Sequence, residues 1–168
     1  KLSEPLKMEL QFDEKPESVQ LFSWNDSLLG QYRDSTEQIP EPLDFASIDV
    51  SFISLKLIFP ALYPLLREGG EIACLIKPQF EAGRDRVGKK GVVRDAQVHL
   101  DVVKEILQFI DADMGWTAQN LSFSPIKGPE GNIEFLVHIL PKCRATHCVT
   151  EQEAAEVVRQ AHESLGNA

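Results

Sequence analysis

The segment FASIDVSFISLKLIFPALYPLLREGGEIACLIKP, residues 45–78, decides the fold, because two short apolar runs flank an apolar stretch with helical spacing. The first run ends at Asp49 and the second at Lys77, and both are rich in Ile, Leu, Phe or Ala. Short apolar runs bounded by Gly, Pro or charged residues are typical of strands that are buried on both faces. A strand, a helix and a second strand in this order predict part of a parallel α/β sheet.

A third charged residue, Glu134, lies within the apolar run GNIEFLVHIL, residues 131–140. In an open α/β sheet the carboxyl ends of the strands meet at one edge, and ligands bind there. We therefore expect Asp49, Lys77 and Glu134 to share this edge, where two acids and a base can carry out proton transfer. For any single residue, the simpler alternative is that the charge marks where a strand meets water. Three such residues, each beside an unusual loop, favour a shared site.

Capping signals place the helices along the rest of the chain. Ser54 and Asp95 precede two apolar helical patterns, and Thr150 with Glu153 forms a capping-box pattern before a third. The short loop between the last two strands predicts an antiparallel pair. The predicted strands fall within residues 7–12, 18–24, 45–50, 71–78, 116–125 and 131–140, and the predicted helices within 55–68, 96–112 and from 150 onward. This order predicts a three-layer α/β fold whose mostly parallel sheet ends in an antiparallel C-terminal hairpin.

The composition is that of an ordinary globular domain. With 168 residues, 43% of them hydrophobic and 26% charged, the chain suits one domain with a substantial core. No apolar run approaches the roughly 18 residues of a membrane span, and no signal-peptide pattern opens the chain. The three cysteines, one of them within an apolar strand, indicate reduced thiols in a cytoplasmic protein.

The cysteines and histidines do not predict a metal site. Cys143 and Cys148 flank His147, but four ligands at the spacing of a zinc site are not present, so we expect no bound metal. His99 lies within the predicted helix 96–112, and we expect it to pack in the core rather than to act as an acid or base.

The charge distribution argues against general nucleic-acid binding and leaves one basic region. A net charge of −9 is opposite in sign to the basic surface that such binding needs. Between residues 77 and 104 the balance turns positive, through Arg84, Arg86, Lys89, Lys90 and Arg94. Such a patch beside the site can bind a phosphate backbone, whereas the alternative is a solvated loop, and composition favours neither.

Three segments together resemble a known family: IDVSFISLKLIFPAL (48–62), LIKPQFEAGRDRVGKKGVVRD (75–95) and SFSPIKGPEGNIEFLVHI (122–139). In order and spacing they are similar to the TlyA, or haemolysin-A-like, family of rRNA 2′-O-methyltransferases, which is related to the FtsJ/RrmJ group. The resemblance implies a Rossmann-like methyltransferase sheet with S-adenosylmethionine as the methyl donor. The implied methyl acceptor is the ribose 2′-hydroxyl of a cytidine in ribosomal RNA. It divides the chain into an N-terminal remnant (1–42), an FtsJ-like core (43–141) and a C-terminal tail with a helix (142–168).

The resemblance also implies roles for individual residues. The family uses a Lys-Asp-Lys-Glu tetrad, and Asp49, Lys77 and Glu134 match its last three members. A ribose hydroxyl is a poor nucleophile until it loses its proton, so Lys77, when neutral, is expected to accept that proton. Asp49 is also expected to contact the donor, together with Ser51. The residues expected to contact RNA are Phe80, Arg84, Arg86, Lys89 and Lys90. The implied partner is ribosomal RNA or a ribosomal subunit, and the oligomeric state stays open.

Two family features are not found, and they leave alternatives open. No S4-like RNA-binding segment precedes the enzyme pattern, and no glycine-rich donor loop follows a first strand, since Gly30 is the only glycine before Gly69. The sheet is therefore expected to be incomplete in its N-terminal half, and the chain to bind the donor weakly. The alternative function is a non-catalytic relative that serves as an RNA-binding or scaffold module. A pore-forming haemolysin is less favoured, because no amphipathic or spanning segment supports it.

Overall fold

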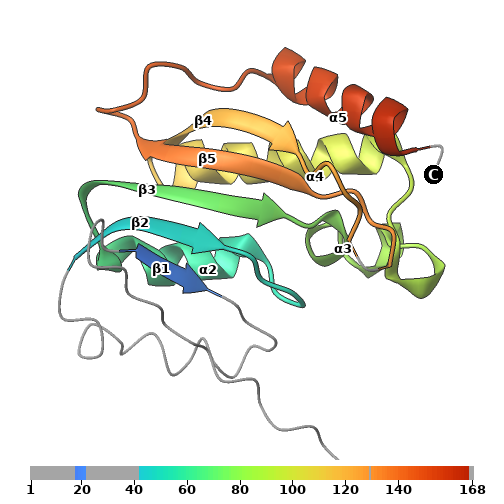
Figure 1. Ribbon diagram of the computed structural model, residues 1–168, viewed down its shortest axis with the longest axis horizontal. Helices are drawn as coiled ribbons and strands as arrows, with labels where there is room; N and C mark the ends of the chain where they lie inside the picture. The colour runs from blue at the N-terminus through green and yellow to red at the C-terminus, as the bar shows by residue number, and fades with distance from the viewer. Residues whose placement is uncertain (1–17, 22–41, 129, 167–168) are drawn as a thin grey trace, which may run out of the picture.

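The computed structural model describes residues 18–21, 42–128 and 130–166, which form an α/β fold around one mixed sheet. The sheet has five strands in the order β1-β2-β3-β5-β4 (Figure 1). The strands are β1 (Ser18–Leu21), β2 (Leu43–Ile48), β3 (Leu66–Ile76), β4 (Trp116–Phe123) and β5 (Phe135–Pro141). The first three are parallel to one another, and β5 runs antiparallel to both β3 and β4. The predicted antiparallel hairpin is confirmed, and the strand predicted within residues 7–12 lies outside the described residues.

Helices α2 and α4 lie behind the sheet in Figure 1, and α5 packs against α4 and β4. The longer helices are α2 (Leu55–Leu62), α4 (Ala96–Gln108), which continues as the π-helical turn η5 (Phe109–Asp113), and α5 (Glu151–Leu165). The shorter ones are η2 (Tyr63–Leu65), α3 (Pro78–Glu81), η3 (Arg84–Arg86) and η4 (Lys89–Gly91). The basic region between residues 84 and 91 therefore contains the short helical turns η3 and η4.

The starts of the three longer helices agree with the predicted caps. Ser54, Asp95 and Thr150 each accept a hydrogen bond from a backbone N–H of the first turn that follows. At α5 the carboxylate of Glu153 accepts the N–H of Thr150 in return, which completes the capping box. Since these bonds satisfy backbone donors that the helix itself leaves unpaired, they define where each helix begins.

Helix α2 is shorter than predicted. The sequence predicted a helix to residue 68, but α2 ends at Leu62, one 3₁₀ turn follows, and β3 already begins at Leu66. Pro64 has no N–H to continue the helical ladder, so the chain leaves the helix here. Gly70 lies within β3, where a Cβ would come within 3.1 Å of the carbonyl oxygen of Leu43 on β2.

The core lies between the sheet and its helices. In β3 the side chains of Ile72, Cys74 and Ile76 are buried, whereas Ala73 and Leu75 on the opposite face are only half-buried. The prediction that this strand is buried on both faces is therefore wrong for one face. The reason is that α2 and α4 lie on the same side of the sheet, so within the described part of the chain no helix covers the other.

Candidate active site

The three charged residues predicted as a site lie at one edge of the sheet. Asp49 directly follows β2, and Lys77 directly follows β3. Glu134 was predicted within a strand, but it directly precedes β5. Because β5 is antiparallel and Phe135 pairs with Ile76, the start of β5 lies beside the carboxyl end of β3. The reversal of the last strand thus places Glu134 at the same edge as the other two residues.

Lys77 is fixed by two oxygen atoms from the segment after β2. Its Nζ lies 2.5 Å from Oδ1 of Asp49 and donates a hydrogen bond of 3.3 Å to Oγ of Ser51. The Lys77 side chain is 13% exposed, whereas that of Asp49 is 44% exposed. The ammonium group is therefore held in a largely dry position, while the carboxylate keeps one side open to a ligand.

Glu134 lies in a narrow polar slot next to this ion pair. It is 8% exposed, and its Oε1 accepts a hydrogen bond of 3.3 Å from Nε2 of Gln79. Burial raises the pKa of Glu134, and Lys77 and the bond from Gln79 offset part of this effect, whereas Asp49 adds to it. A Cβ on Gly128 would come within 2.8 Å of Oε1 of Glu134, so a larger residue at this position would force the carboxylate to move.

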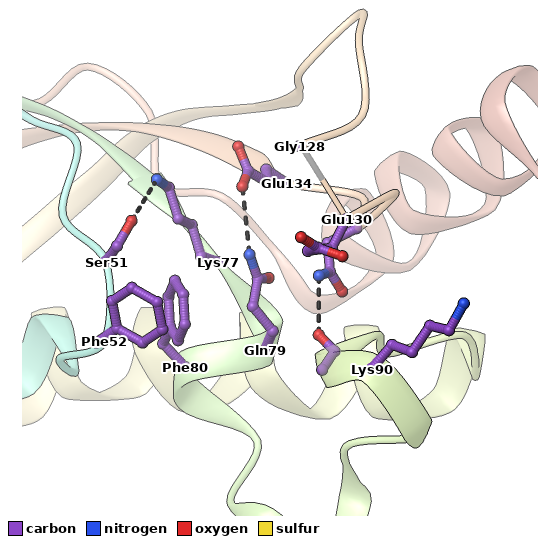
Figure 2. Close-up of a pocket in the computed structure, with 11 residues that line it drawn as sticks. Ser51, Phe52, Lys77, Gln79, Phe80, Lys90, Gly128, Glu130 and Glu134 are labelled. Atoms are coloured by element: carbon purple, nitrogen blue, oxygen red, sulfur yellow. Dashed lines mark hydrogen bonds between the residues drawn. The ribbon is translucent and has the colours of Figure 1, made fainter.

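A cavity of about 670 Å³ opens over these residues (Figure 2). The rings of Phe52 and Phe80 lie against each other in one wall, with centroids 4.9 Å apart. Phe52 is 64% exposed and has a φ of +65°, which is unusual for a residue other than glycine. An exposed ring held in such a backbone conformation is a feature of ligand sites rather than of cores. The lining residues are Ser51, Phe52, Lys77, Gln79, Phe80, Lys90, Gly91, Gly128, Glu130, Asn132 and Glu134.

The predicted RNA-binding residues fall into three groups. Phe80 and Lys90 line the cavity, and Arg84 and Lys89 are exposed on the turns η3 and η4. Arg86 instead forms contacts within the chain. Its guanidinium donates to the carbonyl oxygen of Ala82 at 2.7 Å and forms ion pairs with Asp101 and Glu105 on α4. We therefore leave Arg86 out of the proposed RNA contacts.

Asn132 connects two of the loops that border the cavity, and the sequence did not reveal this role. The side chain is 2% exposed; its Oδ1 accepts the N–H of Val93 at 2.9 Å, and its Nδ2 donates to the carbonyl oxygen of Gly91 at 3.0 Å. These bonds hold the η4 turn against the segment that carries Glu134. Asn132 and Gln79 were each detectable only as neighbours of a predicted site residue, two positions from Glu134 and from Lys77.

The described residues contain neither a cluster of metal ligands nor a helix suited to crossing a membrane. Among these residues, no group of three His, Cys, Asp or Glu side chains is placed to hold a metal ion. His147, which lies between two cysteines in sequence, contacts the carboxylate of Glu153 at 3.0 Å. Within the same part of the chain, no helix has the length and apolar character needed to cross a membrane.

Comparison with known proteins gives one consistent result. The model of the FtsJ-like methyltransferase family matches residues 7–139. A Bacillus subtilis protein named "Putative rRNA methyltransferase YqxC" is 50% identical over 134 residues, which cover 79% of this chain and 46% of that protein. The Mycobacterium tuberculosis "16S/23S rRNA (cytidine-2′-O)-methyltransferase TlyA" is 37% identical over 60% of this chain and 37% of its own length. A solved structure titled "Putative hemolysin from Streptococcus thermophilus" superposes with a TM-score of 0.72 at 41% identity, over 81% of this chain and 49% of that one.

The chain spans about half the length, or less, of these relatives. The match to the family model nevertheless covers most of the chain and includes Asp49, Lys77 and Glu134. The fold is therefore shared with the family, whereas the role of this edge and the activity, substrate and partners of the longer relatives are matters for a proposal.

Proposed function

Because the chain belongs to the FtsJ-like methyltransferase family, we propose that it serves the transfer of a methyl group from S-adenosylmethionine to a ribose 2′-hydroxyl of ribosomal RNA. The observation that carries the proposal is the cluster at the sheet edge, where Lys77 is held by Asp49 next to a buried Glu134. The relative named as a cytidine-2′-O-methyltransferase supports a cytidine as the target. We assign the enzyme core to residues 43–141 and treat 142–168 as a tail, whose helix α5 packs against α4 and β4.

The residues at the edge suit the chemistry of this transfer. S-adenosylmethionine supplies an activated methyl group on a positively charged sulfur. The half-exposed carboxylate of Asp49 attracts that positive charge, and Ser51 lies beside it as a further polar contact. Lys77, once deprotonated, accepts the proton of the 2′-hydroxyl while the new oxygen–carbon bond forms and the sulfur–carbon bond breaks. Glu134 orients the lysine or the ribose, and positioning of this kind supplies several kcal/mol of the barrier.

The wall and rim of the cavity suit a nucleotide. Phe52 and Phe80 offer ring faces on which a base can stack, and base–aromatic stacking contributes about 1–3 kcal/mol per base. Lys90 at the cavity, with Arg84 and Lys89 on the adjacent turns, supplies cations for the phosphate backbone. These contacts are local, which is compatible with a chain of net charge −9.

A methylation assay with matched lysine variants tests the proposal. The chain is incubated with S-adenosylmethionine labelled in its methyl group and with ribosomal RNA, and 2′-O-methylated nucleosides are measured by mass spectrometry. Lys77→Met should reduce the rate about a hundredfold or more, the usual effect of removing a general base. Lys142→Met removes an exposed lysine that pairs with Asp111 and lies at the opposite end of β5 from Glu134, so it should leave the rate unchanged. Near-normal activity of Lys77→Met would exclude the proton-acceptor role.

A second candidate function, a non-catalytic RNA-binding module, is favoured by one observation. Gly30 is the only glycine before Gly69, so a glycine-rich donor loop cannot be built from the first 68 residues. We therefore expect weak binding of S-adenosylmethionine by this chain alone. Calorimetric titration separates the two functions: no donor binding together with retained RNA binding supports the module, whereas micromolar donor binding supports the enzyme.

A further inference from the structure

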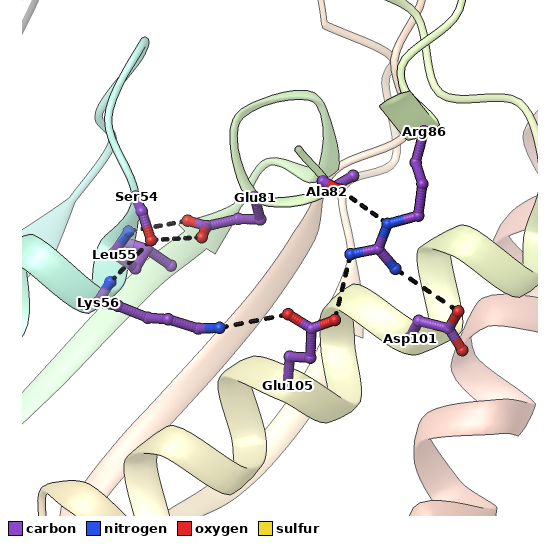
Figure 3. Close-up of polar contacts among 8 residues, drawn as sticks. All are labelled: Ser54, Leu55, Lys56, Glu81, Ala82, Arg86, Asp101 and Glu105. Carbon is purple, nitrogen blue, oxygen red and sulfur yellow. Dashed lines mark hydrogen bonds and ion pairs between the residues drawn. The ribbon is translucent and has the colours of Figure 1, made fainter. Parts of the chain in front are cut away.

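A half-buried carboxylate next to the cavity joins two elements that are distant in sequence (Figure 3). Glu81, the last residue of α3, accepts a hydrogen bond of 2.6 Å from the hydroxyl of Ser54 and one of 2.8 Å from the N–H of Leu55. Each carboxylate oxygen thus binds one donor at the start of α2. The two bonds join residues that are 27 and 26 positions apart in the chain, so together they fix the position of α3 relative to α2.

Glu81 is half-buried, and its surroundings perturb its carboxyl group. Burial raises the pKa of its carboxyl, and the two hydrogen bonds and the positive charge of Lys56 lower it in part, whereas Glu105 adds to the increase. A carboxylate at the N-terminus of a helix is stabilised by the unpaired N–H groups and by the helix dipole. The simplest reading is therefore that Glu81 caps α2 from another element.

The two joined elements are also the two halves of the aromatic wall. Phe52 lies two residues before Ser54, and Phe80 lies one residue before Glu81. Their rings are 4.9 Å apart at an angle of 47°, although they come from different segments. Phe52 holds a φ of +65°, a conformation that costs about 1–3 kcal/mol and persists only where the surroundings impose it. The Glu81 bonds lie next to both rings and restrain both backbones.

A second set of ion pairs, centred on Glu105, lies nearby but involves no residue that lines the cavity. Glu105 on α4 pairs with Lys56 at 3.3 Å and with Arg86 at 3.2 Å, so it ties α2 and the η3 turn to α4. These residues do not line the cavity. Figure 3 shows the two sets side by side, which makes Glu105 a matched comparison for Glu81, since both are glutamates bound to α2.

We propose that Glu81 is a positioning residue that holds Phe52 against Phe80 and so forms the stacking site for a nucleotide base. This role rests on the proposed function, because the base is that of the RNA acceptor. Glu81 does not line the cavity and acts through the two aromatic residues. A role limited to capping α2 would affect stability without changing the geometry of the wall.

The test compares Glu81→Ala, Glu81→Gln and Glu105→Ala by two readouts. The first is the nuclear Overhauser effect between the Phe52 and Phe80 rings, and the second is the affinity for a short fluorescein-labelled oligocytidylate, measured by anisotropy. Glu81→Ala should lose the ring contact and bind about tenfold more weakly, the effect of losing one stacking platform. Glu81→Gln should retain both, because its amide accepts the N–H of Leu55 and donates to the hydroxyl of Ser54. Glu105→Ala should retain both even if it is less stable.

The outcomes separate the role of Glu81 from the proposed function. If folded Glu81→Ala keeps the ring contact and the affinity of the unaltered chain, the positioning role is wrong. If Glu81→Ala does not fold, Ser54→Ala decides, since it removes one of the two bonds and should weaken the ring contact in part. An unchanged contact in that variant overturns the proposal. If the unaltered chain does not bind oligocytidylate, the RNA function fails, and the ring contact alone still tests Glu81.

Discussion

Replacing His99 by glutamine should make the chain less sensitive to acid. His99 on α4 is fully buried, and its Nδ1 lies 2.7 Å from Nε2 of His162 on α5. Its ring also packs edge-on against Phe135 on β5. Among the described residues, Nε2 of His99 has no hydrogen-bond partner. A proton added to this ring would therefore place a positive charge in a dry core beside a second imidazole. This position agrees with the predicted role of His99 as a packing residue.

The size of the effect follows from the pKa. Burial and, to a smaller extent, the neighbouring His162 lower the pKa of His99 from 6.5 to about 4, and Asp95 opposes part of this decrease. The unfolded chain takes up this proton near the ordinary value, whereas the folded chain resists it, so the contribution to stability is complete above about pH 6.5. It declines as the pH falls toward about 4. At about 1.4 kcal/mol per pKa unit, the loss amounts to about 3 kcal/mol of the free energy of unfolding.

Urea unfolding followed by circular dichroism, at a series of pH values between about 7 and about 4, measures this loss. Glutamine at position 99 can still bond to His162 but does not titrate, so His99→Gln should lose about 3 kcal/mol less than the unaltered chain. Contributions from carboxylates are common to both proteins and cancel in the difference. His147→Gln, which removes an exposed histidine, should follow the unaltered chain. Equal losses for His99→Gln and the unaltered chain would refute the reasoning.

Three further changes test the site. Lys77→Met should raise the pKa of Glu134 further, because Lys77 lowers it; an unchanged value in a ¹³C NMR titration would mean that the two groups do not interact. Gly128→Ala places a methyl group 2.8 Å from Oε1 of Glu134 and should lower the free energy of unfolding by about 1–3 kcal/mol, measured by urea unfolding. An unchanged free energy of unfolding would show that the slot around Glu134 is not tight. Asn132→Ala leaves the N–H of Val93 without its partner and should speed hydrogen exchange at that amide, whereas unchanged protection would argue against the link.

Local patterns were sufficient for most elements of the described fold. The caps at Ser54, Asp95 and Thr150 were predicted correctly because a cap needs only residues within one turn of each other. The antiparallel hairpin of β4 and β5 followed from the short loop between them. The end of α2 was missed because the apolar helical pattern continues to residue 68, although Pro64 lacks the N–H that the helical ladder needs.

The sequence by itself also identified the side chains that we propose for the chemistry, since Asp49, Lys77 and Glu134 each stand next to an apolar run and within family motifs. Only the tertiary structure decided how they meet. Glu134 reaches the shared edge because β5 runs antiparallel, and its raised pKa comes from burial under a loop. Only the structure shows that Arg86, which was predicted to contact RNA, also pairs with α4, and that Glu81, which had no predicted role, binds the start of α2. Such contacts join residues that are far apart in the chain, and spacing along a sequence records only neighbours, so packing alone determines them.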